Sequence, residues 1–438
     1  MDFIGIIFTL VITTLFGYYS IDFIIGEKLL TPYKYALGFG VGYGLAAILL
    51  VLMQLFGFGW SWPAIVTFFI LFLILNFSLK HFWTASFKLS ISKKSVIALL
   101  IYLLLAFVFF EATVRPLSSW DGWSSWEMRA RAMSIDKRIS IEQFQYLQTE
   151  YPLVVPLYTA FAYGVIGEIN DTAILLLSWY FYLLVGIVSY IYISTKTNSS
   201  YGLFFTFLIL STQNLIRHGG RYEGGLADII MSYFLLSALI LLSLFIEKKK
   251  TGTLVLISIF LGIIANIKNE GIFFSVVVFA ATFYYLVQFK QLKKIYVLSL
   301  YFIPFLSWIL FKIIEPLPQG ILDIKPHASF QTITHLIVVE LEQYFNIQNW
   351  NLGWLFVLVS TFYLFIKKRL TGVLLILIIL TFSYSLIFLF SKVDPIEHAK
   401  GVLDRLLLHI FPSFIVFVSI GLYPYLKSNR LLKRFGLV

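Results

Sequence analysis

Long apolar segments dominate this sequence and limit the folds that it can adopt. A helix needs about 17–25 mainly apolar residues to cross the hydrocarbon core of a bilayer. Thirteen segments of roughly this kind follow one another along the chain. They cover residues 3–25, 35–56, 62–79, 95–113, 172–194, 201–216, 226–246, 253–269, 271–288, 295–313, 352–366, 372–391 and 405–425. The sequence therefore predicts an all-α polytopic membrane protein with about thirteen transmembrane helices.

The composition agrees with this class and excludes two others. Apolar residues make up 60% of the 438 residues and charged residues 13%, whereas soluble proteins have about 45–50% and about 25%. Too little polar surface exists to cover a soluble core, and disorder would need low hydrophobicity and high charge. Cysteine is absent, which excludes disulfides, thiolate metal sites and a cysteine nucleophile.

Charges are divided between the two ends of the expected helices. If segment 151–167 does not cross the bilayer, 20 of the 33 lysines and arginines lie on one side and 19 of the 22 acids on the other. Cytoplasmic loops are rich in Lys and Arg, so we expect a plasma-membrane protein with its N-terminus outside and its C-terminus in the cytoplasm. Segment 151–167, which contains Pro152 and Pro156, is then expected to be a re-entrant or surface-lying helix. The net charge of +11 arises from scattered loops, which argues against a nucleic-acid partner.

Two segments on the expected outer side are long. They cover residues 114–171 and 314–351, and both are expected to carry loop helices that pack over the membrane helices. Residues 1–94 would form N-terminal transmembrane helices, and residues 426–438 a basic cytoplasmic tail. Because both long segments would cover the helices on the outer side, they favour a site at the outer membrane surface.

The densest polar cluster lies in the first of these segments, between Arg115 and Arg131. Trp120, Trp123 and Trp126 are spaced by three, which predicts one shared helical face, and Asp121 lies among them. One interpretation is an interfacial aromatic belt with snorkelling arginines. The other is a carboxylate in a pocket walled by indoles, where Asp121 takes a proton from a sugar hydroxyl and a tryptophan stacks on the sugar.

Three further clusters fall on the same side. The first contains Arg221, Glu223 and Asp228, with Asp228 opening a helix, where an acid also favours the helix dipole. The second contains Lys268 and Glu270, charges between two apolar segments that need a partner or a cavity and can equally form a buried structural pair.

The last cluster opens the final segment. Arg405 and His409 are four residues apart and so share one helical face. Arginine is suited to bidentate phosphate contact, and interfacial snorkelling is the alternative. A separate glycine run, Gly38 to Gly44, lies within an apolar segment and predicts close helix packing rather than a dinucleotide-binding loop.

Carboxylates, cations and aromatic rings at one membrane surface suit glycosyl transfer from a polyprenyl-phosphate sugar. A carboxylate deprotonates the acceptor hydroxyl, and cations stabilise the departing lipid phosphate. No cofactor is required by the sequence. A divalent cation bound jointly by Asp121, Glu223 and Asp228 stays open, because spacing in the sequence does not show whether these side chains meet.

Over residues 95–425 the chain resembles the GT-C superfamily of integral-membrane glycosyltransferases, specifically its bacterial protein-mannosyltransferase-like (ArnT-like) branch. The resemblance rests on Trp120-Asp121-Gly122-Trp123, on the Tyr151-Pro152 to Pro156 element and on the three later clusters. It implies Asp121 as the base, with Glu223 and Asp228 as further catalytic acids. The expected lipid-phosphate ligands are Lys268, Arg405, His409 and Arg221. The expected sugar or acceptor contacts are Trp120, Trp123, Trp126, Tyr151 and Glu270.

The expected partners are thus the lipid bilayer, a polyprenyl-phosphate sugar donor and an exoplasmic acceptor such as a cell-envelope glycan, lipid or protein. Two alternatives stay open. One is a transporter or flippase of a lipid-linked glycan, which would need charges deep in the helices. The other is a polysaccharide polymerase or ligase with a diphosphate-linked donor.

Overall fold

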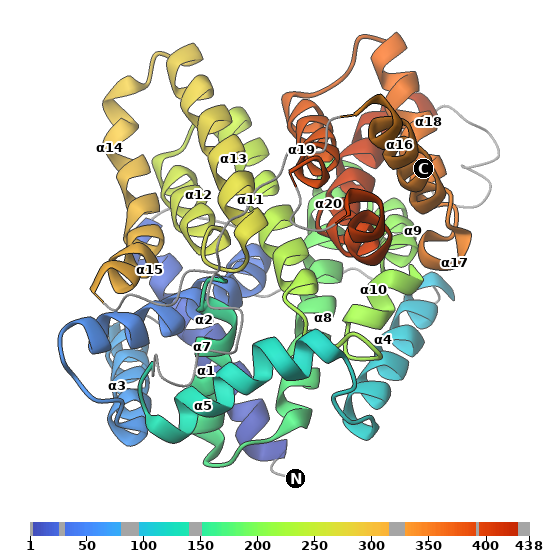
Figure 1. The fold of residues 1–438 in the computed structure, drawn as a ribbon. Helices are drawn as coiled ribbons and strands as arrows, with labels where there is room; N and C mark the ends of the chain where they lie inside the picture. The colour runs from blue at the N-terminus through green and yellow to red at the C-terminus, as the bar shows by residue number, and fades with distance from the viewer. Residues whose placement is uncertain are drawn as a thin grey trace.

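The computed structural model describes residues 3–25, 31–79, 96–139, 151–314, 329–390 and 394–427. Within these ranges every regular element is a helix (Figure 1). The first half of the chain forms α1 (Phe3–Ile25), α2 (Thr31–Leu55), α3 (Trp62–Leu79), α4 (Val96–Val114), η1 (Gly122–Glu127), α5 (Met128–Asp136), α7 (Val154–Ile166), α8 (Asp171–Lys196), α9 (Ser199–Leu210) and α10 (Gln213–His218). The second half forms α11 (Asp228–Lys248), α12 (Thr251–Ile264), α13 (Asn269–Gln288), η2 (Leu292–Lys294), α14 (Ile295–Leu298), η3 (Ser299–Tyr301), α15 (Phe302–Ile314), α16 (Phe330–Tyr344), α17 (Ile347–Trp350), α18 (Gly353–Ile366), α19 (Gly372–Phe388) and α20 (Pro395–Leu426).

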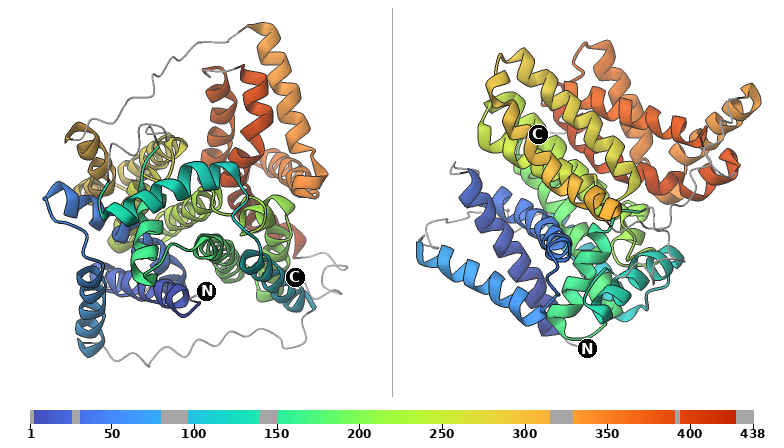
Figure 2. Two further views of the ribbon diagram at one scale, coloured as in Figure 1. Left: turned by 60° about the horizontal axis from the view of Figure 1, so that its bottom comes forward. Right: turned by 60° about the vertical axis from the view of Figure 1, so that its left-hand side comes forward.

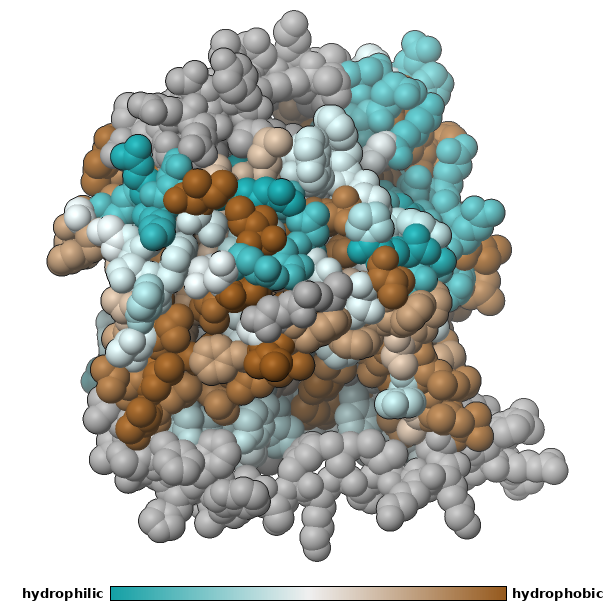
Figure 3. All heavy atoms as spheres, turned by 90° about the horizontal axis from the view of Figure 1, so that it is seen from below, coloured by the Kyte–Doolittle hydropathy of each residue, from teal (hydrophilic) through white to brown (hydrophobic). Residues whose placement is uncertain are grey.

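The helices confirm an all-α multi-pass membrane protein. Eight of them in the described part are long and apolar enough to cross a bilayer, namely α1, α2, α4, α8, α11, α13, the stretch Leu292–Ile314 and α20. Each of the thirteen expected segments coincides with helix, but several of these helices are shorter, so the number of thirteen spans stays a prediction. Figure 3 shows a broad band of hydrophobic side chains beside a band of hydrophilic ones, as a bilayer-embedded surface requires.

Two expected boundaries are wrong. The segment 201–216 is broken after Leu210, where α9 ends and the short helix α10 follows. The final helix begins at Pro395 rather than at residue 405, because the Asp394 side chain caps it by accepting from the amides of Ile396 and Glu397 at 3.0 Å.

Segment 151–167 contains α7, a buried helix too short to cross a bilayer. Its residues from Val154 to Tyr163 are all buried, and it packs against α1, α2, α3 and α5. A covered short helix agrees with the expectation that protein shields this segment from lipid.

The centre of the molecule is α11, which packs against α8, α12 and α20 and is apolar and buried on nearly all sides. Figure 2 shows the N-terminal helices (blue) and the C-terminal helices (orange and red) on opposite sides of this central group. A helix that is apolar all round avoids water by burial in protein or in the bilayer, and α11 is buried in protein. The polar start of α11 therefore lies among several other helix ends.

The glycine run in α2 packs closely against α1, as the sequence predicts. A Cβ on Gly42 would lie 2.1 Å from the carbonyl oxygen of Thr13, and one on Gly17 would lie 1.8 Å from that of Gly38. Both neighbours are backbone atoms, which cannot rotate away. The two helices approach through small residues spaced four apart, a common membrane-helix contact.

Changing Gly17 to alanine is expected to lower the free energy of unfolding by about 1–3 kcal/mol or more, because α1 and α2 must separate. Thermal unfolding in detergent micelles measures this effect. The matched control is Gly401→Ala, since a Cβ there meets no atom within 4 Å and alanine favours a helix. An unchanged melting temperature for Gly17→Ala would contradict the close packing of α1 and α2.

Candidate functional site

The segment that carries Asp121 is held against the turn before α11. Ser119 Oγ donates to the carbonyl oxygen of Gly224 at 2.9 Å, and a Cβ on Gly122 would lie 3.2 Å from that same oxygen. The glycine after Asp121 therefore permits a close approach of two backbones. The one-turn π-helix η1 follows directly, a geometry frequent at functional sites.

Asp228 opens α11, as predicted, and is completely buried. Three donors from distant parts of the chain contact its carboxylate. They are Nζ of Lys268 at 2.9 Å, Nε of Arg405 at 3.1 Å and Nε2 of His409 at 2.8 Å. A buried carboxylate is tolerated because all three donors compensate for its lost hydration.

Arg405 connects this buried carboxylate to Asp121. Its Nη1 donates to Asp121 Oδ2 at 2.6 Å, while its Nε contacts Asp228. Arg405 and His409 thus face the same partner, as their spacing of four predicts. Arg405 lies within α20 rather than at its start, so the helix holds the guanidinium more rigidly than a helix end would.

Lys268 also contacts Glu270, with 3.5 Å between Nζ and Oε1. The start of segment 151–167 lies beside this pair, because the amide of Val154 donates to the carbonyl oxygen of Asn266 at 3.3 Å. Tyr151 is within electrostatic reach of Glu270 and Lys268, and burial raises the pKa of its phenol. Lys268 is therefore buried and Glu270 partly exposed, and the pair borders the candidate site.

Tyr384 is a member of this arrangement that the sequence did not suggest. Its hydroxyl lies 2.8 Å from Nδ1 of His409. Because Nε2 of His409 faces a carboxylate, the neutral ring donates there and accepts from Tyr384 at Nδ1. No charge or motif distinguishes this tyrosine within its apolar helix α19.

We call the following set of residues the Asp228 cluster: Asp121, Asp228, Lys268, Glu270, Arg405 and His409. It holds three carboxylates and two fixed cations. Its accessible edge consists of the ion pair and Glu270, since the side chains of Asp121, Arg405 and Glu270 are 37%, 17% and 18% exposed, whereas Asp228 and His409 are buried completely. Chemistry on an external substrate is therefore open to Asp121 and Arg405, and Asp228 orients them from below.

Glu223 does not belong to the Asp228 cluster. It forms an ion pair with Arg217, and its Oε2 lies 2.6 Å from Nε2 of the buried His218. Burial alone would raise the pKa of Glu223, but His218 and Arg217 outweigh it and lower the pKa to about 2. Arg217 also lies 3.7 Å from Asp404. Glu223 is therefore an ionised partner in a neighbouring ion group, and its role as a catalytic acid stays a prediction.

Arg221 is separated from the Asp228 cluster as well. Its Nε contacts Glu111 Oε2 at 2.9 Å, and Arg115 forms an ion pair with the same oxygen. Glu111 is an acid inside the apolar helix α4, and such an acid is by itself a signal of function, although it stands apart from the polar clusters of the sequence.

The three tryptophans do not share one face. Trp120 is 74% exposed and Trp123 42% exposed, with their ring centroids 5.8 Å apart. Trp126 is buried, 5.6 Å from the ring of Tyr151. The π-helical turn has a longer repeat than an α-helix, so a spacing of three does not align the side chains here.

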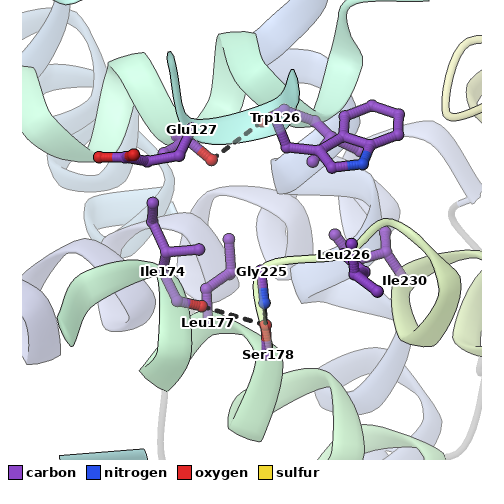
Figure 4. A pocket seen from close by; sticks show the side chains of 10 residues that line it. Trp126, Glu127, Ile174, Leu177, Ser178, Gly225, Leu226 and Ile230 are labelled. Carbon is purple, nitrogen blue, oxygen red and sulfur yellow. Dashed lines mark hydrogen bonds between the residues drawn. The ribbon is translucent and has the colours of Figure 1, made fainter. Parts of the chain in front are cut away.

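Trp126 borders a small cavity of about 10 Å³, shown in Figure 4. Ser178 of α8 accepts from the amide of Gly225 at 2.9 Å there and donates to the carbonyl oxygen of Ile174 at 3.1 Å. The volume corresponds to about one water molecule, too little for a sugar. Trp126 and the bonds of Ser178 therefore support the turn before α11.

A metal site is not evident in the described ranges, where no group of three or more His, Asp or Glu side chains could hold an ion. Asp121 and Asp228 both accept hydrogen bonds from Arg405, and Glu223 forms an ion pair with Arg217. Each of the three acids considered as ligands of a shared divalent cation thus has a cationic partner within the described residues.

Comparisons of the chain with family models, with curated proteins and with solved structures found no match.

Proposed function

We propose that the protein is a glycosyltransferase of the GT-C type, which transfers a sugar from a polyprenyl-phosphate donor to an acceptor outside the cytoplasm. The observation that carries this proposal is the accessible pair of Asp121 and Arg405, 2.6 Å apart at the polar edge of an apolar helix bundle. The pair combines a proton acceptor with an anion-binding group. Sugar transfer from a lipid phosphate needs both kinds of group in one site, the base at the acceptor oxygen and the cation at the leaving phosphate.

The transfer step is a displacement at the anomeric carbon of the donor. The acceptor oxygen forms a bond to this carbon while its proton passes to Asp121. The bond between the anomeric carbon and the phosphate oxygen breaks, and its electron pair stays on that oxygen. Polyprenyl phosphate therefore leaves as an anion beside Arg405, and the buried Lys268 adds positive charge to the site without contacting the phosphate.

An exchange at Arg405 would couple donor binding to the base. Its Nη1 is occupied by Asp121 in the protein alone. A donor phosphate that takes this nitrogen releases Asp121 to accept the proton of the acceptor. The contact of Nε with the buried Asp228 prevents the guanidinium from rotating, so Asp228 acts as a positioning residue, and His409 orients Asp228 in turn.

Exposed aromatic rings beside Asp121 suit the sugar. Trp120 and Trp123 present their rings to solvent, and aromatic faces stack on apolar sugar faces. Tyr151 and Glu270 border the same site and would contact the sugar or the acceptor. A lipid donor removes the need for a nucleotide-binding domain, and neither a cofactor nor a divalent cation enters the proposed step.

The test is donor cleavage by the full-length protein reconstituted in nanodiscs. The probes are polyprenyl phosphates carrying single hexoses or pentoses, with glycerol as a surrogate acceptor, and mass spectrometry detects free polyprenyl phosphate. Cleavage is expected with at least one donor. The variant Glu397→Gln, which changes an exposed acid paired with Lys400, should be equally active.

Two results would overturn the proposal in favour of its alternatives. Movement of the lipid-linked sugar across liposome membranes without any release of polyprenyl phosphate indicates a flippase. Release of polyprenyl diphosphate from diphosphate-linked oligosaccharides, with no activity on monophosphate donors, indicates a polymerase or ligase.

A further inference from the structure

Arg115 and Arg221 form a cationic pair outside the Asp228 cluster. Both arginines contact the same oxygen of Glu111, and Arg221 does so through Nε at 2.9 Å. Two guanidiniums against one carboxylate leave one positive charge. Neither arginine makes the bidentate contact with Glu111 that would occupy two of its nitrogens, so donors remain for an anion.

The pair is accessible from outside the protein. The side chains of Arg115 and Arg221 are 32% and 22% exposed. Both guanidiniums lie 4.6 Å from the ring centroid of Tyr222, which is itself exposed. The ring limits the movement of both arginines without neutralising them.

The position of the pair matches the headgroup level of a membrane. Glu111 and Arg115 lie at the end of α4, a helix that exposes apolar side chains including Phe107 and Phe110. The guanidinium of Arg221 lies 5.5 Å from the Phe107 ring. The arginines thus stand where the lipid-facing surface of α4 ends, which is where lipid phosphates lie.

An apolar cavity of about 490 Å³ lies further along the same helix. It is bordered by Ile101 and Leu105 of α4, and by residues of α1, α2, α8 and α9 that include Tyr18, Leu184 and Leu203. Ile101 and Leu105 precede Glu111 by roughly 9–15 Å along a helix that rises about 1.5 Å per residue. Half of a hydrocarbon core measures about 15 Å. The distance from the cationic pair to the cavity along α4 therefore matches the distance from the phosphate of a lipid to its acyl chain.

We propose that this arrangement is a binding site for an anionic phospholipid. Arg115 and Arg221 contact its phosphate, and one acyl chain follows α4 into the cavity. The site is independent of the proposed sugar transfer, because its two arginines form ion pairs with Glu111. Arg405 and Lys268 form their ion pairs with a different carboxylate, that of Asp228. An unbalanced positive charge favours a lipid with net negative charge over a zwitterionic one.

Native mass spectrometry of the purified full-length protein tests this site. The probes are dioleoyl phosphatidylglycerol and the net-neutral dioleoyl phosphatidylcholine. The wild type is expected to bind the anionic lipid about tenfold more tightly. The double variant Arg115→Gln/Arg221→Gln should lose this preference. The control Lys400→Ala, which removes an exposed lysine paired with Glu397, should keep it.

A second variant tests the cavity separately. Leu105→Trp fills part of the space and should weaken binding of dioleoyl phosphatidylglycerol, but not of its dihexanoyl analogue. Equal binding of the two dioleoyl lipids by the wild type would overturn the proposal without any variant. An unchanged preference in the folded arginine double variant would do the same. Displacement of phosphatidylglycerol by equimolar polyprenyl phosphate would assign the pair to a donor lipid instead.

Discussion

Replacing Asp228 with asparagine is expected to lower the free energy of unfolding by about 3–5 kcal/mol, since breaking a buried ion pair leaves its partners uncompensated. Three donors converge on this carboxylate. An amide can accept from one or two of them but cannot balance the charges of Lys268 and Arg405. Thermal and denaturant unfolding in detergent micelles measure the loss.

The control for this variant is Glu397→Gln, which also neutralises one acid of an ion pair. Glu397 and Lys400 are exposed, and exposed pairs contribute about 0–1 kcal/mol. The double variant Asp228→Leu/Lys268→Met should be more stable than Asp228→Leu, because it removes a stranded charge together with its partner. If Asp228→Asn unfolds like the wild type, the three contacts do not hold the start of α11 to the middle of α20.

The helices could be predicted from the sequence because hydrophobicity decides them. Every expected apolar segment contains helix, and the glycine run in α2 packs as its spacing of four indicates. The expected start of the final helix is wrong because a capping side chain, which hydropathy does not measure, begins this helix earlier in the chain. The polar turn of α20 before residue 405 is helical because of Asp394 and Pro395, a cap signal that an apolar window does not register.

The candidate site could be predicted only in part. The pairing of Arg405 with His409 on one face follows from helix geometry, whereas the contact between Arg405 and Asp121 joins residues 284 positions apart. The short segment 217–228 shows the limit most clearly. Its Arg221, Glu223 and Asp228 have three separate sets of partners, and Gly225, where φ is +87°, lies between Glu223 and Asp228.

Replacing Asp121 with asparagine is expected to reduce sugar transfer by about 10²–10⁴-fold, the usual contribution of a general base. The amide keeps the shape of the side chain and can still accept from Arg405, but it cannot take the acceptor's proton. The loss should appear in kcat, and the donor KM should not rise, because Arg405 remains and the neutral amide competes less with the phosphate for its Nη1. Release of polyprenyl phosphate in nanodiscs measures it.

Stability separates this effect from a structural one. The Asp121 side chain is partly exposed, so Asp121→Asn should unfold within about 1 kcal/mol of the wild type, unlike Asp228→Asn. The variant Asp121→Glu retains a carboxylate one methylene further out and should recover part of the rate. Full activity of a folded Asp121→Asn protein would exclude Asp121 as the base. A rate loss matched by an equal loss of stability would make the ion pair with Arg405 a structural contact, because positioning alone then accounts for the defect.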